Sequence, residues 1–104
     1  MKIENLTEYS VLIPTEDNHG NSVWNAVEMF ERALAAEFSG FTVTECHGHC
    51  GGVYEPMREY RVAMKGDASR FFKIAQDYAF NHMGQKALYT KSPGGWVQII
   101  EGGE

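Results

Sequence analysis

The segment Cys46–Cys50, Cys-His-Gly-His-Cys, contains both cysteines and two of the four histidines of the chain. Such side chains bind zinc or form redox pairs. In an extended strand, however, Cys46 and Cys50 share a face about 13 Å apart. One tetrahedral zinc ion holds its sulfur ligands at about 2.3 Å and cannot take both without a sharp bend. Gly48 would permit that bend, but no C-x₂-C knuckle and no second ligand pair accompany it.

Three interpretations of this segment remain. The favoured one is a strand with packed cysteines and exposed histidines. The second is a metal site, since His47 and His49 share a strand face and could take up nickel or zinc adventitiously. The third is a C-x₃-C redox pair, although the C-x-x-C motif at a helix N-terminus is absent. We expect no resident metal ion and no cofactor, so a chelator should change neither activity nor melting temperature.

The residues after this segment are better suited to a small ligand. Gly51 and Gly52 allow close backbone approach, and Tyr54 offers an aromatic face to a cation. Glu59, or the nearby Glu55, supplies a carboxylate. The simpler alternatives are hairpin packing for Tyr54 and an ion pair with Arg61 for Glu59. The sequence contains no Ser/His/Asp triad order, no phosphate-binding P-loop and no G-x-G-x-x-G motif.

The hydrophobic pattern predicts which elements position these residues. Strands are expected at 8–14, from 41, at 58–65, at 86–91 and at 95–102, with helices after Ser22 to about 38 and from Asp67 to Gly84. The order βαββαβ, followed by one hairpin strand, predicts an α+β, ferredoxin-like sandwich of residues 1–104 as a single domain. Both helices should cover one face of the antiparallel sheet. The other face should carry Thr42, Thr44, Glu59 and Arg61, and a second subunit should cover it.

Composition narrows the functional classes. The formal net charge is −5, from 14 acidic and 9 basic residues, and no Lys/Arg cluster occurs. This disfavours a nucleic-acid partner and is compatible with a cationic small ligand. No apolar run approaches the about 20 residues of a membrane span. The N-terminal residues lack the apolar region of a signal peptide, so we expect no membrane association and a cytoplasmic location.

Several short motifs follow one another along the chain: YSVLI at 9–13, Gly40, Gly52-Val53-Tyr54, Glu59, Gln85, ALYTKS at 87–92 and GWVQIIEG at 95–102. In this layout, from about residue 8 to residue 102, the chain resembles the small phage-encoded S-adenosylmethionine (SAM) lyases, formerly called SAM hydrolases. The four residues between Tyr54 and Glu59 form a shorter loop than the family has. This departure leaves open whether Glu55 or Glu59 is the important carboxylate.

The resemblance implies cleavage of SAM to 5′-methylthioadenosine and homoserine lactone by attack of the substrate's own carboxylate. Glu59 would bind the ammonium and Tyr54 the sulfonium, as the catalytic pair. Backbone amides at the turn formed by Pro14, Thr15 and Glu16 would hold the adenine, and Gly52 and Met64 would complete the substrate-binding set. The resemblance also implies a homo-oligomer, a trimer before a dimer, with SAM between subunits, in the host cytoplasm if the chain is phage-encoded.

A different class of function fits the same residues. A non-catalytic ferredoxin-like module could bind a small ligand or a metal ion and oligomerise through its open sheet face. A metal-binding version would use His47, His49 and the two cysteines. Formation of methylthioadenosine from SAM distinguishes the enzyme from such a regulatory module.

Overall fold

The computed structural model describes residues 1–102. Its elements, in chain order, are β1 (Thr7–Pro14), α1 (Trp24–Glu37), β2 (Thr42–Cys50), β3 (Val53–Met64), α2 (Ser69–Asn81), β4 (Ala87–Lys91), the 3₁₀ turn η1 (Pro93–Gly95) and β5 (Val97–Glu101). Both predicted start signals lie two residues before the first residue of a helix. Ser22 Oγ accepts the Trp24 N–H, and the Asp67 carboxylate accepts the N–H and hydroxyl of Ser69. The second helix ends at Asn81, before Gly84.

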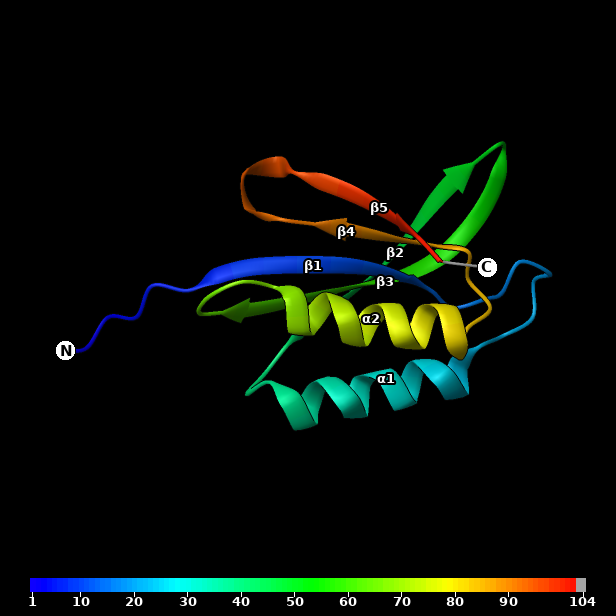
Figure 1. Cartoon of the computed structure of the whole chain (residues 1–104). Helices are drawn as coiled ribbons and strands as arrows, with labels where there is room; N and C mark the ends of the chain where they lie inside the picture. The colour runs from blue at the N-terminus through cyan, green and yellow to red at the C-terminus, as the bar shows by residue number, and fades with distance from the viewer. Residues whose placement is uncertain (103–104) are drawn as a thin grey trace.

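The sheet has the strand order β2-β3-β1-β4-β5, and all its pairs are antiparallel. The first four strands have the ferredoxin-like arrangement, and β5 extends the sheet as the hairpin partner of β4. Figure 1 shows α1 and α2 side by side on one face of this sheet. The α+β ferredoxin-like prediction, with two helices on one face and an extra C-terminal strand, is therefore confirmed.

The core lies between the helices and the sheet. Alternation along β1 and β3 places Val11, Ile13, Tyr60 and Val62 on the helix-covered face, and each has no exposed surface. The helices contribute the predicted stripes, which contain Val27, Phe30, Leu34, Phe71, Ala75 and Ala79. The Phe30 and Tyr60 rings meet edge to face at 4.9 Å between centroids. Such burial of aromatic and aliphatic side chains is the main stabilising contribution to the fold.

The β2–β3 hairpin is longer than the sequence pattern predicted. β2 continues through Cys46–Cys50, and β3 begins at Val53 instead of Arg58. The turn is Gly51-Gly52, with φ angles of +59° and +80°. Two consecutive residues with positive φ make the tight turn that matches strand twist, and glycine adopts it without strain. The extended hairpin reaches beyond the helix layer in Figure 1.

Gly48 has a packing role in this hairpin. A Cβ atom at Gly48 would lie 2.7 Å from the Met57 terminal methyl group, closer than carbon atoms can approach. Because this methyl group ends a flexible side chain, a residue larger than glycine would displace it. β2 stays extended through Gly48, without the bend that a metal site would need.

The second face of the sheet carries no helix. Strand register places Thr42, Thr44, Glu59 and Arg61 on it, as predicted, together with Leu12, Tyr89, Val97 and Ile99. Ile99 is 65% exposed and lies opposite Tyr89, which is 40% exposed. Among residues 1–102, no helix has the length and apolar character needed to cross a membrane.

Candidate ligand-binding site

A cavity of about 330 Å³ opens where the loop after β1 meets the β2–β3 hairpin. Its lining includes Thr15, Glu16, Trp24, Glu45, Tyr54 and Arg58. A second hollow of about 240 Å³ shares Glu16 and Tyr54 with the first and adds Asp17 and Glu55. The structure therefore brings together, within one chain, the first-strand loop and the hairpin tyrosine that the sequence singled out.

Hydrogen bonds to three other segments of the chain hold the loop after β1. The Thr15 N–H donates to the Pro56 carbonyl at 3.1 Å, and the Val23 N–H donates to the Thr15 carbonyl at 3.0 Å. The Gln85 side-chain amide donates to the Glu16 carbonyl at 3.1 Å. Pro14 is buried and has no N–H, so neither Pro14 nor Thr15 has a backbone amide free for adenine. Thr15 and Glu16 both line the cavity.

Asp17 stabilises the same loop from the exposed side. Its carboxylate accepts the N–H groups of His19 at 2.8 Å and Asn21 at 2.9 Å. The bonds from the Asn21 and His19 amides lower the pKa of Asp17 from its ordinary value. Asp17 is therefore charged at neutral pH, and it adds to the negative charge around the second hollow.

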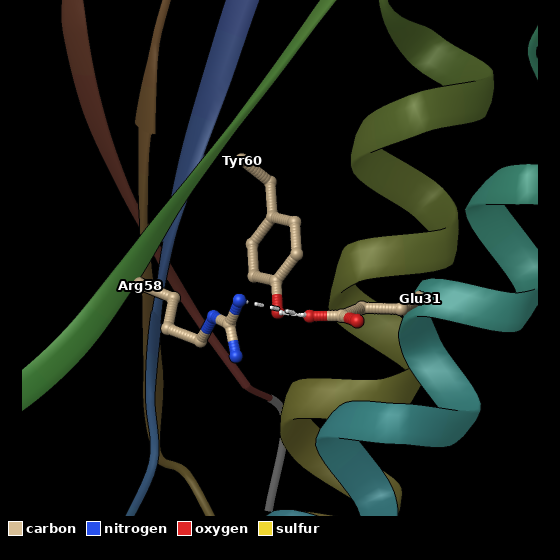
Figure 2. A network of polar contacts seen from close by, with 3 residues as sticks. All are labelled: Glu31, Arg58 and Tyr60. Atoms are coloured by element: carbon tan, nitrogen blue, oxygen red, sulfur yellow. Dashed lines mark hydrogen bonds and ion pairs between the residues drawn. The ribbon is translucent and has the colours of Figure 1, made fainter. Parts of the chain in front are cut away.

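Arg58 is the basic group of the larger cavity, and Figure 2 shows how it lies. Its guanidinium carbon is 4.9 Å from the centroid of the Trp24 ring, and one terminal nitrogen is 3.6 Å from the Glu31 carboxylate. The Tyr60 hydroxyl donates to the same Glu31 oxygen at 2.5 Å. Burial, together with the hydrogen bond to Glu31, raises the pKa of Tyr60. The phenol therefore stays neutral and takes the strongest hydrogen bond that Glu31 offers.

The Arg58 guanidinium makes no hydrogen bond to another described residue. Its Nε is buried and has no hydrogen-bond partner among the described residues, and the contact with Glu31 is longer than a hydrogen bond. The side chain is only 17% exposed, so its position is set by packing against Trp24. A guanidinium fixed in this way presents a fork that matches a carboxylate.

Tyr54 belongs to a cluster of three rings near the tip of the hairpin. Its ring centroid lies 5.1 Å from that of His47 and 5.8 Å from that of His49, and the two imidazoles are 5.5 Å apart. Strand pairing sets this arrangement. His49 lies directly opposite Tyr54, and His47 precedes His49 by two residues on β2, so its side chain lies on the same face. Tyr54 is 58% exposed, so one side of its ring is accessible.

Glu59 lies on the other face of the sheet. It is five residues from Tyr54 on β3, and an odd separation in a strand points two side chains in opposite directions. Glu59 lines a separate hollow of about 330 Å³ with Arg61, Lys91 and Ser10. Within one chain, the structure does not bring the two predicted catalytic residues to the same ligand.

Two other predicted positions also lie outside the cavity lining. Met64 is at the far end of β3 from Tyr54, on the order of 30 Å away along the strand, and it packs against the core. Gly52 lies in the exposed hairpin turn, where its positive φ is its structural role. Cys46, by contrast, lines the larger cavity and also lies near Glu59; both burial and that carboxylate raise the pKa of its thiol. Both cysteines are free thiols.

Sequence reasoning missed Trp24, Glu31 and Arg58. The alternation of side-chain faces along β3 contained a signal for Arg58. Arg58 shares its face with Tyr60 and Val62, which are core residues. A charged residue in register with a core stripe is rarely buried without a partner or a function, so this position could have been singled out.

Comparison with known proteins adds information only at the level of structure. No protein-family model matches the chain, and no curated protein sequence matches it. A solved phage SAM lyase in complex with S-methyl-5′-thioadenosine superposes with a TM-score of 0.60 at 9% identity, over 98% of this chain and 97% of that chain. A phage SAM lyase in the apo state gives a TM-score of 0.63 at 12% identity, over 100% and 98%.

The chain shares the fold of phage SAM lyases. The resemblance in layout noted from the sequence is therefore confirmed over essentially the whole length of both proteins. At 9% and 12% identity, the likeness concerns the path of the backbone and not the side chains of a site.

Proposed function

We propose that this protein binds SAM in the cavity between the loop after β1 and the β2–β3 hairpin, and cleaves it to methylthioadenosine and homoserine lactone. The observation that carries the proposal is the make-up of this cavity. It combines an exposed aromatic ring, an excess of carboxylates and one fixed guanidinium. Support also comes from the shared fold, since one phage SAM lyase was solved with S-methyl-5′-thioadenosine, a product of this cleavage.

The charges of the two hollows complement those of SAM. Glu16, Glu45, Asp17 and Glu55 line them, and Arg58 is the basic residue among the lining groups. SAM carries a sulfonium, an ammonium and a carboxylate, and so has a net positive charge. Arg58 would receive the carboxylate, and the acidic side chains would receive the ammonium. The Tyr54 ring would lie against the sulfonium, a contact worth about 0.5–2 kcal/mol.

The chemistry needs no acid, base or metal ion. One oxygen of the substrate carboxylate attacks the γ-carbon, the C–O bond forms, and the C–S bond breaks with its electron pair moving to sulfur. The products are neutral methylthioadenosine and protonated homoserine lactone, so atoms and charge balance. Opposite charges neutralise each other in the transition state, which a poorly hydrated cavity favours. The role of the protein is to fold the methionyl chain into the geometry that closes the ring.

The position of Glu59 makes assembly part of the proposal. If Glu59 and Tyr54 act on one substrate, they must come from different subunits, because they face opposite sides of the sheet. We propose a homo-oligomer, a trimer before a dimer, in which the open face of one chain lies against the hairpin cavity of its neighbour. The exposed apolar group Tyr89, Val97 and Ile99 gives that face a surface to bury. Within one chain, the carboxylates that line a hollow together with Tyr54 are those of Glu16, Asp17, Glu45 and Glu55.

The test is product analysis with purified protein. SAM is incubated with the protein, and methylthioadenosine and homoserine lactone are separated by chromatography, with a protein-free sample subtracted for spontaneous cyclisation. In H₂¹⁸O, a lyase gives lactone free of label. Direct hydrolysis gives homoserine labelled at its hydroxyl group. Binding of SAM without product would indicate a non-catalytic module, and absence of both binding and product would contradict the proposal.

A further inference from the structure

We propose that His47 and His49 form an exchangeable site for a divalent transition-metal ion, with Ni²⁺ and Zn²⁺ as the fitting chemistry. The two residues lie on one face of β2, and both are exposed. Their ring centroids are 5.5 Å apart. Two imidazoles that share one tetrahedral ion at about 2.0–2.1 Å from each nitrogen have their centroids about 5 Å apart. The separation of the two rings therefore matches the separation that chelation of one ion requires.

The cysteines of the same segment do not join this site. Cys46 and Cys50 point to the opposite face of β2, because they alternate with the histidines. Within residues 1–102, no group of three His, Cys, Asp or Glu side chains is arranged to hold a metal ion. The histidine pair supplies two ligands, and water would complete the coordination. Such a site exchanges its ion readily and is distinct from the closed structural site that the cysteine spacing disfavours.

The ion would lie beside Tyr54, whose ring contacts both imidazoles. Tyr54 also lines the cavity described above. A dication at the ring would repel a cationic ligand there and leave a neutral one unaffected. We therefore infer that metal binding weakens the affinity for SAM and spares methylthioadenosine. This second part rests on the proposed function, whereas the metal site does not.

The first experiment is calorimetric titration of tag-free protein with NiCl₂, since imidazole suits Ni²⁺ and thiolate prefers softer ions. We expect one ion per chain, and each of His47→Gln and His49→Gln should weaken binding by about tenfold or more. His19→Gln and the double variant Cys46→Ser/Cys50→Ser should bind as the unmodified protein does. Paramagnetic broadening of the Tyr54 ring signals in NMR locates the ion independently of any variant. Ni²⁺ binding that survives both histidine substitutions, or no binding at all, overturns the site.

The second experiment measures SAM and methylthioadenosine affinity with and without saturating NiCl₂. SAM affinity should fall severalfold and methylthioadenosine affinity should stay constant. A His47→Gln/His49→Gln variant under the same conditions corrects for Ni²⁺ bound by free SAM. An equal effect in this variant overturns the coupling. Failure of SAM to bind the metal-free protein overturns both the proposed function and the coupling, and the nickel titration still decides the metal site.

Discussion

Tyr54 and Glu59 occupy the same strand and point to opposite faces of the sheet. Tyr54 pairs with His49 on the face that the helices cover, and Glu59 pairs with Thr44 on the open face. Both were predicted to contact one SAM molecule. The distance along the strand is small, but the sheet separates the side chains, so a shared ligand requires two chains.

Subunit complementation tests this relationship. Tyr54→Ala and Glu59→Gln should each be inactive alone and should regain activity when equal amounts exchange subunits. Each site draws its two functional residues from different chains, so about a quarter of the sites in a random mixture become complete. Turnover of the mixture is compared with that of each variant. No gain after verified exchange would show that the two residues do not share a site between subunits.

Glu59→Gln tests the carboxylate itself. We expect turnover to fall strongly while the melting temperature stays near that of the unmodified protein, because Glu59 is in a surface hollow and not in the core. Glu55→Gln is the matched variant on the same strand. Unchanged turnover in Glu59→Gln, with loss in Glu55→Gln, would move the ammonium site to the hollow beside Tyr54.

Arg58→Gln should weaken SAM binding and leave methylthioadenosine binding nearly unchanged, because only SAM has a carboxylate. A charged hydrogen bond contributes about 1.5–3 kcal/mol, so the expected loss is about tenfold to a hundredfold. Calorimetric dissociation constants for both ligands give the comparison. Arg32→Gln, at an exposed position on α1, is the control. Equal losses for both ligands would indicate a structural role for Arg58.

Tyr60→Phe should lower the free energy of unfolding by about 1–2 kcal/mol, since it removes the buried hydrogen bond to Glu31. The pKa of Tyr60 is raised on folding, so its contribution is complete below the ordinary tyrosine pKa of about 10 and is lost as the pH rises above it. Urea unfolding between pH 8 and 11 should show a smaller alkaline loss for Tyr60→Phe. Parallel curves for both proteins would contradict this linkage.

Ile99→Lys should dissociate the oligomer without unfolding the chain, because Ile99 is 65% exposed in the single chain. Specific activity should fall with the loss of assembly, and the unmodified protein should lose activity on dilution. Light scattering and activity over a concentration series measure both effects. Met29→Lys, at an exposed position on α1, is the control. A fully active monomer at nanomolar concentration would be incompatible with shared sites.

The sequence by itself determined the order of elements and the core faces. Period-two alternation in 9–13 and 60–64 and the helical stripes depend only on local geometry, and both agree with the structure. The double glycine at 51–52 was a readable turn signal. The extension of β2 and β3 on either side of this turn could not be predicted from the sequence. The polar strand residues there lie beyond the helix layer and lack the hydrophobic alternation that marks a half-buried strand.

Only the tertiary structure decided which side chains meet. The contacts of Arg58 with Trp24 and Glu31 join two elements, β3 and α1. Nothing in the spacing of these residues along the sequence predicts that the two elements meet there. The structure also separates Glu59 from Tyr54. It places Met64 away from the cavity. Strand register fixes the face of every residue, and register arises from pairing between distant segments, which no local pattern contains.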